Sequence, residues 1–199
     1  RQYNGNISLE FRKKMASTVF AITAAYESSI SNFFMKDMEA LPSVVNFNLN
    51  KAADLRYGEN PHQDAAFYLP KGKAIAWHQH QGKQLSYNNY ADMESAFNIT
   101  REFDESACAI IKHANPCGFG IGKNLKEAFI RAVSTDPVSY FGGIVGFNFE
   151  VDSKVAHELI KPFLECIIAP SYSEGALEIL QKKKNLRVIT VRKQGLNDK

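Results

Sequence analysis

The sequence has 199 residues, of which 45% are hydrophobic, including 14 phenylalanines. That is enough apolar material for a sizeable core, in one large domain or in one domain with a piece of another. The formal net charge of +3 is small and dispersed, which argues against a nucleic-acid-binding protein. The sequence contains no run of about 18 apolar residues and no signal peptide, so we expect a cytoplasmic protein without a membrane-spanning helix.

The three cysteines form no C-x-x-C pair, a usage typical of a reducing compartment. Cys108 and Cys166 lie within apolar runs, which predicts that both are core residues. Cys117 stands in a glycine-rich segment, where packing is a simpler interpretation than reactivity.

Apolar residues recur at steps of three and four between Ser8 and Met35, which predicts one long amphipathic helix. Ser8 is suited to cap its N-terminus, and Glu10 lies in the first turn, where the helix dipole favours an acid. The apolar stripe consists of Phe11, Met15, Val19, Ile22, Tyr26, Ile30 and Phe33. We expect a segment of a longer protein, in which residues 1–37 end a preceding domain. The alternative is that the stripe covers the core of residues 38–199.

Short strands and polar turns are expected next, followed by a second helix. The apolar alternation and the turn residues predict strands at 45–49, 65–69 and 74–79, loops at 54–64 and 82–89, and a helix at 90–103.

In the second half of the chain, strands alternate with helices. The pattern predicts strands at 107–111, 144–149, 166–169 and 186–191, with helices beginning near Leu125, Ser153 and Ser173. Short apolar runs with little internal alternation indicate strands that are buried on both faces. We therefore predict an α/β fold: a three-layer subdomain with a largely parallel sheet, built from β-α-β units.

The strand at 107–111 is followed by the best candidates for chemistry, the adjacent Lys112 and His113. In open α/β sheets, ligands bind at the carboxyl ends of the strands. An ammonium group beside an imidazole favours the neutral ring, which can act as a general base, and it can itself stabilise an oxyanion. The alternative is structural, with Lys112 in a surface ion pair and His113 bonded to a loop carbonyl.

Two further segments are candidates for binding an anion. Three glycines alternate in residues 118–122, where backbone N–H groups at the start of a helix can face a phosphate. The spacing fails the dinucleotide fingerprint, since position 123 is lysine, and tight packing is the alternative. Arg56 and Tyr57 stand in a polar loop, where a guanidinium and a phenol suit a phosphate, although one arginine in a loop is usually solvated.

A zinc site is not predicted. The nucleoside deaminase signature requires H-x-E followed by P-C-x-x-C. Pro116 and Cys117 are present, but residue 120 is glycine and no H-x-E occurs. His78 and His80 form an isolated H-x-H without a set of further ligands.

Four long motifs follow one another along the chain. They are LRYGENPHQ (55–63), GKQLSYNN (82–89), KHANPCG (112–118) and DPVSYFGGI (136–144). In type and order they resemble the family of bifunctional AICAR transformylase/IMP cyclohydrolases of purine biosynthesis. The helix at 8–35 and the segment CIIAPSYSEGALEIL (166–180) extend the resemblance over essentially the whole chain.

The resemblance implies transfer of the formyl group of 10-formyltetrahydrofolate to the 5-amino group of the AICAR nucleotide. It implies that His113 is the general base and that Lys112 is the electrophilic stabiliser. The nucleotide contacts that it implies are Arg56, Tyr57, Gly142 and Glu165.

The resemblance also implies two deaminase-like α/β subdomains without zinc, of which residues 38–199 would form the first. Residues 1–37 would end the cyclohydrolase domain. The cyclohydrolase site, the folate contacts and the second subunit of a homodimer would lie outside this chain, so we expect the chain alone to be inactive. Two other interpretations stay open: a nucleotide-binding lyase or hydrolase that uses the Lys–His pair, and a non-catalytic nucleotide-binding module.

Overall fold

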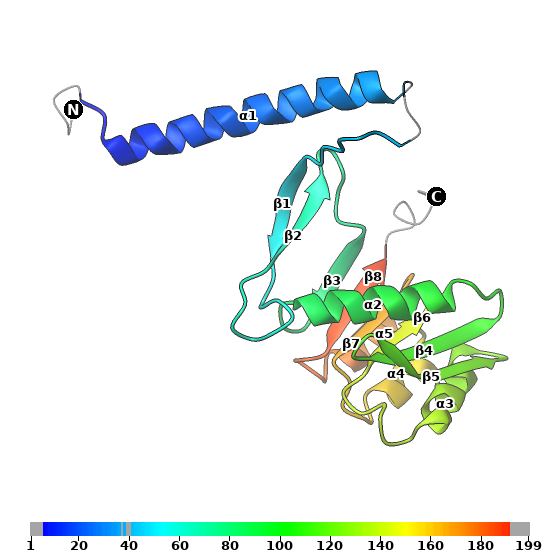
Figure 1. Cartoon of the computed structure of the whole chain (residues 1–199). Coiled ribbons are helices and arrows are strands. Elements are labelled where there is room, and N and C mark those ends of the chain that lie inside the picture. Colours follow the sequence, from blue (N-terminus) through cyan, green and yellow to red (C-terminus); the bar gives the residue numbers. More distant parts are fainter. Residues whose placement is uncertain (1–5, 37, 39–40, 192–199) are drawn as a thin grey trace. The chain divides into compact units, whose positions relative to one another are not determined.

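A computed structural model describes residues 6–36, 38 and 41–191 (Figure 1). The chain divides into two compact units, Arg1–Asn50 with Tyr68–Lys73 and Lys51–Phe67 with Ala74–Lys199. The elements are α1 (Leu9–Met35), β1 (Leu49–Asp54), β2 (Ala66–Pro70), β3 (Trp77–Gln81), α2 (Tyr87–Thr100), β4 (Ser106–Lys112), β5 (Asn115–Gly122), α3 (Leu125–Thr135), β6 (Ile144–Phe147), α4 (Ser153–Leu159), β7 (Cys166–Ala169), α5 (Glu174–Leu180) and β8 (Arg187–Val191).

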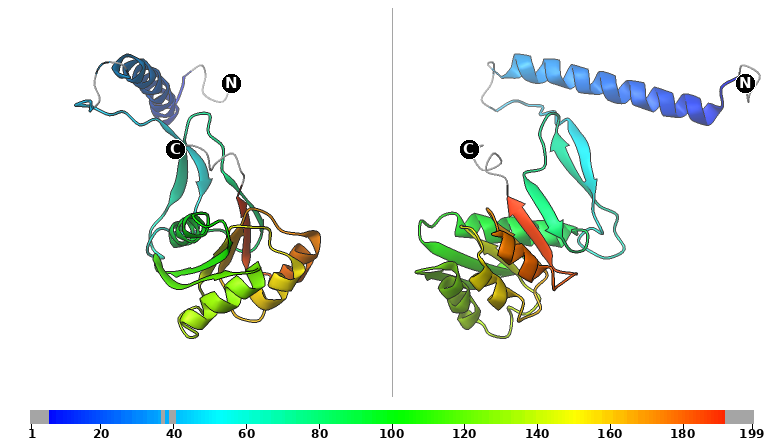
Figure 2. Two further views of the ribbon diagram at one scale, coloured as in Figure 1. Left: turned by 90° about the vertical axis from the view of Figure 1, so that its right-hand side faces the viewer. Right: turned by 180° about the vertical axis from the view of Figure 1, so that it is seen from behind.

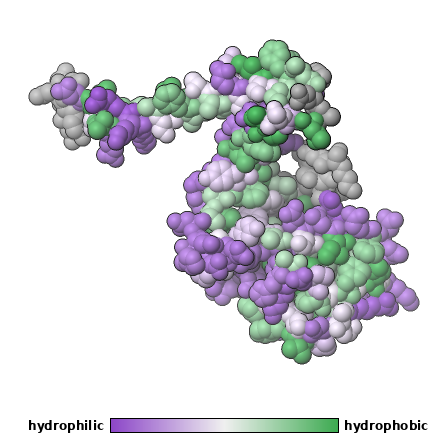
Figure 3. All heavy atoms as spheres, viewed as in Figure 1, coloured by the Kyte–Doolittle hydropathy of each residue, from purple (hydrophilic) through white to green (hydrophobic). Residues whose placement is uncertain are grey.

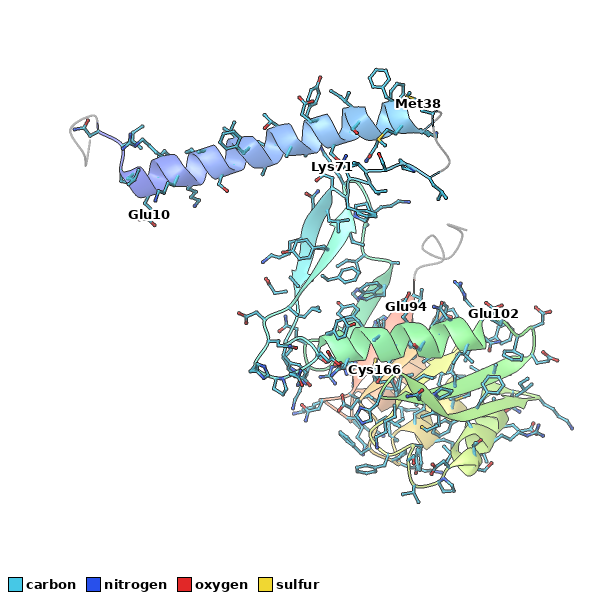
Figure 4. All side chains as sticks on the ribbon, in the orientation of Figure 1. Glu10, Met38, Lys71, Glu94, Glu102 and Cys166 are labelled. Atoms are coloured by element: carbon cyan, nitrogen blue, oxygen red, sulfur yellow. The ribbon has the colours of Figure 1, made fainter. Side chains whose placement is uncertain are left out.

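The predicted N-terminal helix is confirmed as α1. The Ser8 hydroxyl accepts a hydrogen bond from the Phe11 N–H at 3.2 Å, as its capping role requires. Glu10 lies in the first turn (Figure 4). No described residue of α1 is buried, and apolar side chains remain exposed along the helix (Figure 3). These include Phe20 and Phe34, which lie outside the predicted stripe, so the apolar surface is wider than expected.

The predicted strand at 45–49 is wrong. Residues 44–48 have no strand pairing, and β1 begins only at Leu49. Val45 and Phe47 are exposed, while the alternating residues Asn46 and Asn48 bond to α1. The Asn32 side chain donates to the Asn46 carbonyl at 3.1 Å, and the Asn48 side chain donates to the Ala25 carbonyl at 3.5 Å. These bonds to a helix replace the ladder that a strand would need.

Six strands form one sheet in the order β3-β8-β7-β6-β4-β5. α2 packs on one face, against β4, β6 and β7, and α3, α4 and α5 cover the other (Figure 2). The α/β class and the three layers are as predicted. The sheet is mixed, however, where a largely parallel one was expected. β6 with β7 and β7 with β8 are parallel pairs, whereas β3–β8, β4–β5 and β4–β6 are antiparallel.

The mixed topology originates in β5, which was predicted as a loop. β5 pairs with β4 through a two-residue turn, so the chain reverses before it enters α3 and then returns to β6 antiparallel to β4. The glycines of β5 permit this arrangement. A Cβ at Gly118 or Gly120 would lie 2.3 Å or 2.4 Å from a carbonyl oxygen of α3. The glycines therefore let a helix pack directly on the strand, and this supports the packing interpretation over an anion loop.

The core has one apolar cluster on each face of the sheet. Cys108 lies in the cluster under α3–α5 and Cys166 in the cluster under α2 (Figure 4), and both are fully buried, as predicted. Burial raises the pKa of the Cys166 thiol to about 12, so it is not a thiolate at neutral pH. Cys117 is half-buried, and its Sγ lies 3.5 Å from the Ile110 carbonyl.

Candidate functional site

One row of paired residues crosses four strands and defines an edge of the sheet. Ile111 in β4 pairs with Ile144 in β6, Ile144 pairs with Cys166 in β7, and Cys166 pairs with Arg187 in β8. Each predicted residue of this half of the chain stands at or just beyond the row: Lys112, His113, Gly142 and Glu165. The row spans about 14 Å from β4 to β8, given a strand spacing of about 4.8 Å.

The location of this edge corrects the expectation that the site lies at carboxyl ends of strands. Lys112 and His113 do follow the carboxyl end of β4. Because β4 is antiparallel to β6, that end meets the amino ends of β6, β7 and β8. Glu165 therefore reaches the same edge because it precedes its strand, and Gly142 reaches it for the same reason.

His113 occupies the turn between β4 and β5 in an unusual backbone conformation. His113 and Ala114 have φ values of 54° and 63°, and Lys112 pairs with Asn115 across the turn. A two-residue hairpin turn with positive φ at both central residues ordinarily uses asparagine and glycine. Non-glycine residues in this region cost about 1–2 kcal/mol each and are concentrated at functional sites. The turn places the His113 side chain in solvent at the edge of the sheet.

The Lys112 ammonium is held at the start of β6. Its Nζ donates to the Phe141 carbonyl at 2.9 Å, next to Gly142. Gly142 has φ 74°, which requires glycine, and its N–H donates to the Phe163 carbonyl at 2.9 Å. Hydrogen bonds from Ser139, together with one from the Val138 N–H, lower the pKa of Asp136, and Lys112 adds to the lowering. A carboxylate thus stands near the Lys112 charge.

Arg56 and Tyr57 form a compact pair in the loop after β1. The Arg56 guanidinium donates to the Tyr57 hydroxyl at 2.9 Å and lies 4.6 Å from the centre of its ring. The backbone is fixed from the segment before α2: the Arg56 N–H donates to the Leu85 carbonyl at 2.9 Å, and the Tyr87 N–H donates to the Tyr57 carbonyl at 3.1 Å. The Arg56 side chain remains exposed.

Two side chains beside Glu165 were missed by the sequence analysis. Asn89, in the first turn of α2, donates to Glu165 Oε2 at 3.1 Å. Arg187 Nη1 lies 3.5 Å from the same oxygen. Burial lowers the pKa of the Arg187 guanidinium. The Glu165 carboxylate opposes this lowering, and the positive charge of Arg56 adds to it. In the sequence, Arg187 could have been recognised as a single charged residue at the start of the apolar run RVITV (187–191).

The other motifs form no metal site in the part of the chain that the structure describes. No group of three or more His, Cys, Asp or Glu side chains there is arranged to hold a metal ion. The rings of His78 and His80 lie 4.7 Å apart, and His80 Nε2 lies 2.7 Å from the Thr190 hydroxyl. Among the described residues, no helix is long and apolar enough to cross a membrane.

Comparison with known proteins adds independent findings. The family described as "AICARFT/IMPCHase bienzyme" matches residues 1–199. The chain is 49% identical over 193 residues to the bifunctional purine biosynthesis protein PurH of Bacillus mycoides and 46% identical over 189 residues to that of Clostridium botulinum. Both alignments cover 94% of the chain but 38% of the relative, so the chain spans well under half the length of these curated relatives. A structure of Acinetobacter baumannii RibD matches 49% of the chain and 32% of its own, with 13% identity and a TM-score of 0.37.

Proposed function

The chain belongs to the AICARFT/IMPCHase bienzyme family, and from this premise we propose that it carries the Lys112–His113 part of a transformylase active site. The reaction is transfer of the formyl group of 10-formyltetrahydrofolate to the 5-amino group of the AICAR nucleotide. The observation that carries the proposal is the strained turn after β4, which exposes His113 beside Lys112 at the edge where Gly142 and Glu165 also lie.

In the proposed mechanism, the AICAR amine nitrogen forms a bond to the formyl carbon while His113 accepts the amine proton. An aromatic amine conjugated to a carboxamide is a weak nucleophile, so a base is required. The Lys112 ammonium offsets the negative charge that develops on the formyl oxygen. The bond from the formyl carbon to N10 of the folate then breaks, and the nitrogen takes up a proton to give tetrahydrofolate. The Lys112 bond to the Phe141 carbonyl fixes the ammonium at the sheet edge.

Nucleotide binding is assigned to the other residues of this edge. The exposed Arg56 guanidinium, with the Tyr57 hydroxyl, suits a phosphate. Gly142 and Glu165 are assigned to further nucleotide contacts. The finer architecture belongs to the same proposal. Residues 38–199 form a first deaminase-like subdomain without zinc, and residues 1–37 end a cyclohydrolase domain. The full-length protein is a homodimer in the cytoplasm.

The test is His113→Ala in a full-length family member that carries this sequence. Formyl transfer should be abolished, while cyclisation of already formylated AICAR to IMP continues, because the two activities use different domains. Lys126→Ala, on α3 and away from the edge, is the control. Unchanged formyl transfer in His113→Ala would favour a non-catalytic binding module, and loss of both activities in a folded variant would refute the assignment.

A further inference from the structure

The guanidinium of Arg187 is a buried charged group with no part in the proposed chemistry. Arg187 is 3% exposed, and its side chain joins two separate segments. On one side, Nε donates to the Lys83 carbonyl at 3.1 Å and to the Gln84 carbonyl at 3.4 Å, and Nη2 donates to the Gln84 carbonyl at 3.4 Å. On the other side, Nη1 faces the Glu165 backbone oxygen at 3.4 Å and its Oε2 at 3.5 Å.

The segment held by Arg187 supports the Arg56–Tyr57 pair. Residues 83 and 84 continue into Leu85, whose carbonyl accepts from the Arg56 N–H, and into Tyr87, whose N–H donates to the Tyr57 carbonyl. The segment also passes very close to the start of β8. A Cβ at Gly82, where φ is 98°, would lie 2.5 Å from the Leu186 carbonyl and 2.7 Å from Arg187 Cα. Arg187 therefore contacts both parts of the proposed nucleotide site: the Glu165 carboxylate and the segment that supports Arg56 and Tyr57.

Both the charge and the planar shape of the Arg187 side chain contribute to these contacts. The Glu165 side chain is 41% exposed, and Arg187 and Asn89 both contact its Oε2. Only arginine presents a planar fork of donors that serves the Lys83, Gln84 and Glu165 carbonyls and a carboxylate together. Because the guanidinium is buried, it does not itself meet a solvent-borne ligand.

We propose that Arg187 is a positioning residue for nucleotide binding. It fixes the Glu165 carboxylate and, through the 83–87 segment, the backbone of Arg56 and Tyr57. This inference rests on the proposed function, because it assigns Arg187 a supporting role in the proposed nucleotide site.

The experiment compares Arg187→Lys and Arg187→Met with wild type in a full-length family member that carries this sequence. KM and kcat for AICAR are measured in the formyl-transfer assay, and the Kd for AICAR by calorimetry, below the melting temperature of each variant. Arg187→Lys keeps the charge near Glu165 but loses the fork. We expect it to raise KM and Kd at least about tenfold, with kcat within about threefold, as loss of buried charge-assisted bonds requires. Arg187→Met should raise both further.

The control is Arg101→Met, at the opposite end of α2 from Asn89, which should leave KM and Kd unchanged. If Arg187→Lys keeps KM and Kd within twofold of wild type while kcat falls with the folded fraction, Arg187 is only a scaffold residue and the proposal is wrong. The Arg187 result is an affinity, whereas the proposed function is judged by formyl transfer in His113→Ala. The two can therefore fail separately.

Discussion

The Asp92 carboxylate, on α2, accepts a 2.7 Å hydrogen bond from the backbone N–H of Ala114, in the turn that presents His113. Asp92 stands one helical turn after Asn89, which bonds Glu165, so one face of α2 reaches two points of the same sheet edge. A short, nearly buried charge-assisted bond of this kind stabilises the positive-φ turn that its residue types disfavour.

The backbone strain at Ala114 gives the first prediction. Ala114→Gly should increase the free energy of unfolding by about 0.5–1 kcal/mol, because glycine adopts positive φ without a Cβ clash, which outweighs its larger unfolded-state entropy. Urea unfolding followed by circular dichroism measures this. The matched control is Ala91→Gly inside α2, which should destabilise by about 1 kcal/mol. Destabilisation by both substitutions would show that the turn is not strained.

Arg56 provides a prediction about phosphate recognition. Arg56→Ala should weaken binding of the AICAR nucleotide by roughly 1.5–3 kcal/mol through lost charge-assisted hydrogen bonds. Binding of the dephosphorylated nucleoside should change little, and calorimetry in a full-length family member compares the two ligands. Arg131→Ala, an exposed arginine paired with Glu127 on α3, serves as the control. An equal loss for nucleotide and nucleoside would mean that Arg56 does not bind the phosphate.

Acid should remove one specific contribution to stability. Hydrogen bonds from Lys126, on α3, and from Lys161, after α4, lower the pKa of Glu158 from 4.5 to about 2. Since the folded-state pKa is the lower one, the stabilisation is complete above about pH 4.5 and is lost as the pH falls toward about 2. The Lys126 side chain is 45% exposed and the Lys161 side chain 66% exposed, so solvent screening limits this stabilisation to about 1 kcal/mol.

Urea unfolding of Glu158→Gln and wild type tests this linkage. The difference in unfolding free energy should be present at about pH 7 and nearly absent at about pH 2. Glu178→Gln, an exposed residue on α5, is the matched control. A difference for Glu158→Gln that is the same at both pH values would contradict the ion-pair origin.

The exposed apolar surface of α1 leads to a prediction about the isolated chain. Apolar patches of this extent seldom stay uncovered in soluble monomers, so the chain should self-associate through α1 or exchange its amides rapidly there. Deleting residues 1–37 should leave a folded, monomeric α/β domain. Light scattering gives the mass and circular dichroism the folding. If the truncated chain unfolds, α1 belongs to the core of this domain and a boundary near residue 38 is wrong.

Local sequence signals determined most of the helices. A capping side chain stands at the start of each: Ser8, Ser86, Asn124, Asp152 and Ser173. Such caps act over three residues, so they are visible without the rest of the fold. α2 nevertheless begins at Tyr87, capped by Ser86, whereas the predicted helix began at residue 90. The prediction missed this start because Ser86 lies in a segment that was predicted as a loop.

The sequence by itself also identified Lys112 and His113 as candidate catalytic residues, since adjacent groups with complementary chemistry need no distant contact to be recognised. Only the tertiary structure decided which strand ends meet them. Strand direction depends on pairing between residues far apart in the chain. The β4–β5 hairpin, whose second strand is rich in glycine and was predicted as a loop, makes β4 antiparallel to β6. The same long-range pairing brought Arg187 beside Glu165 and the 83–84 carbonyls, because a buried charge is tolerated only where distant segments supply its partners.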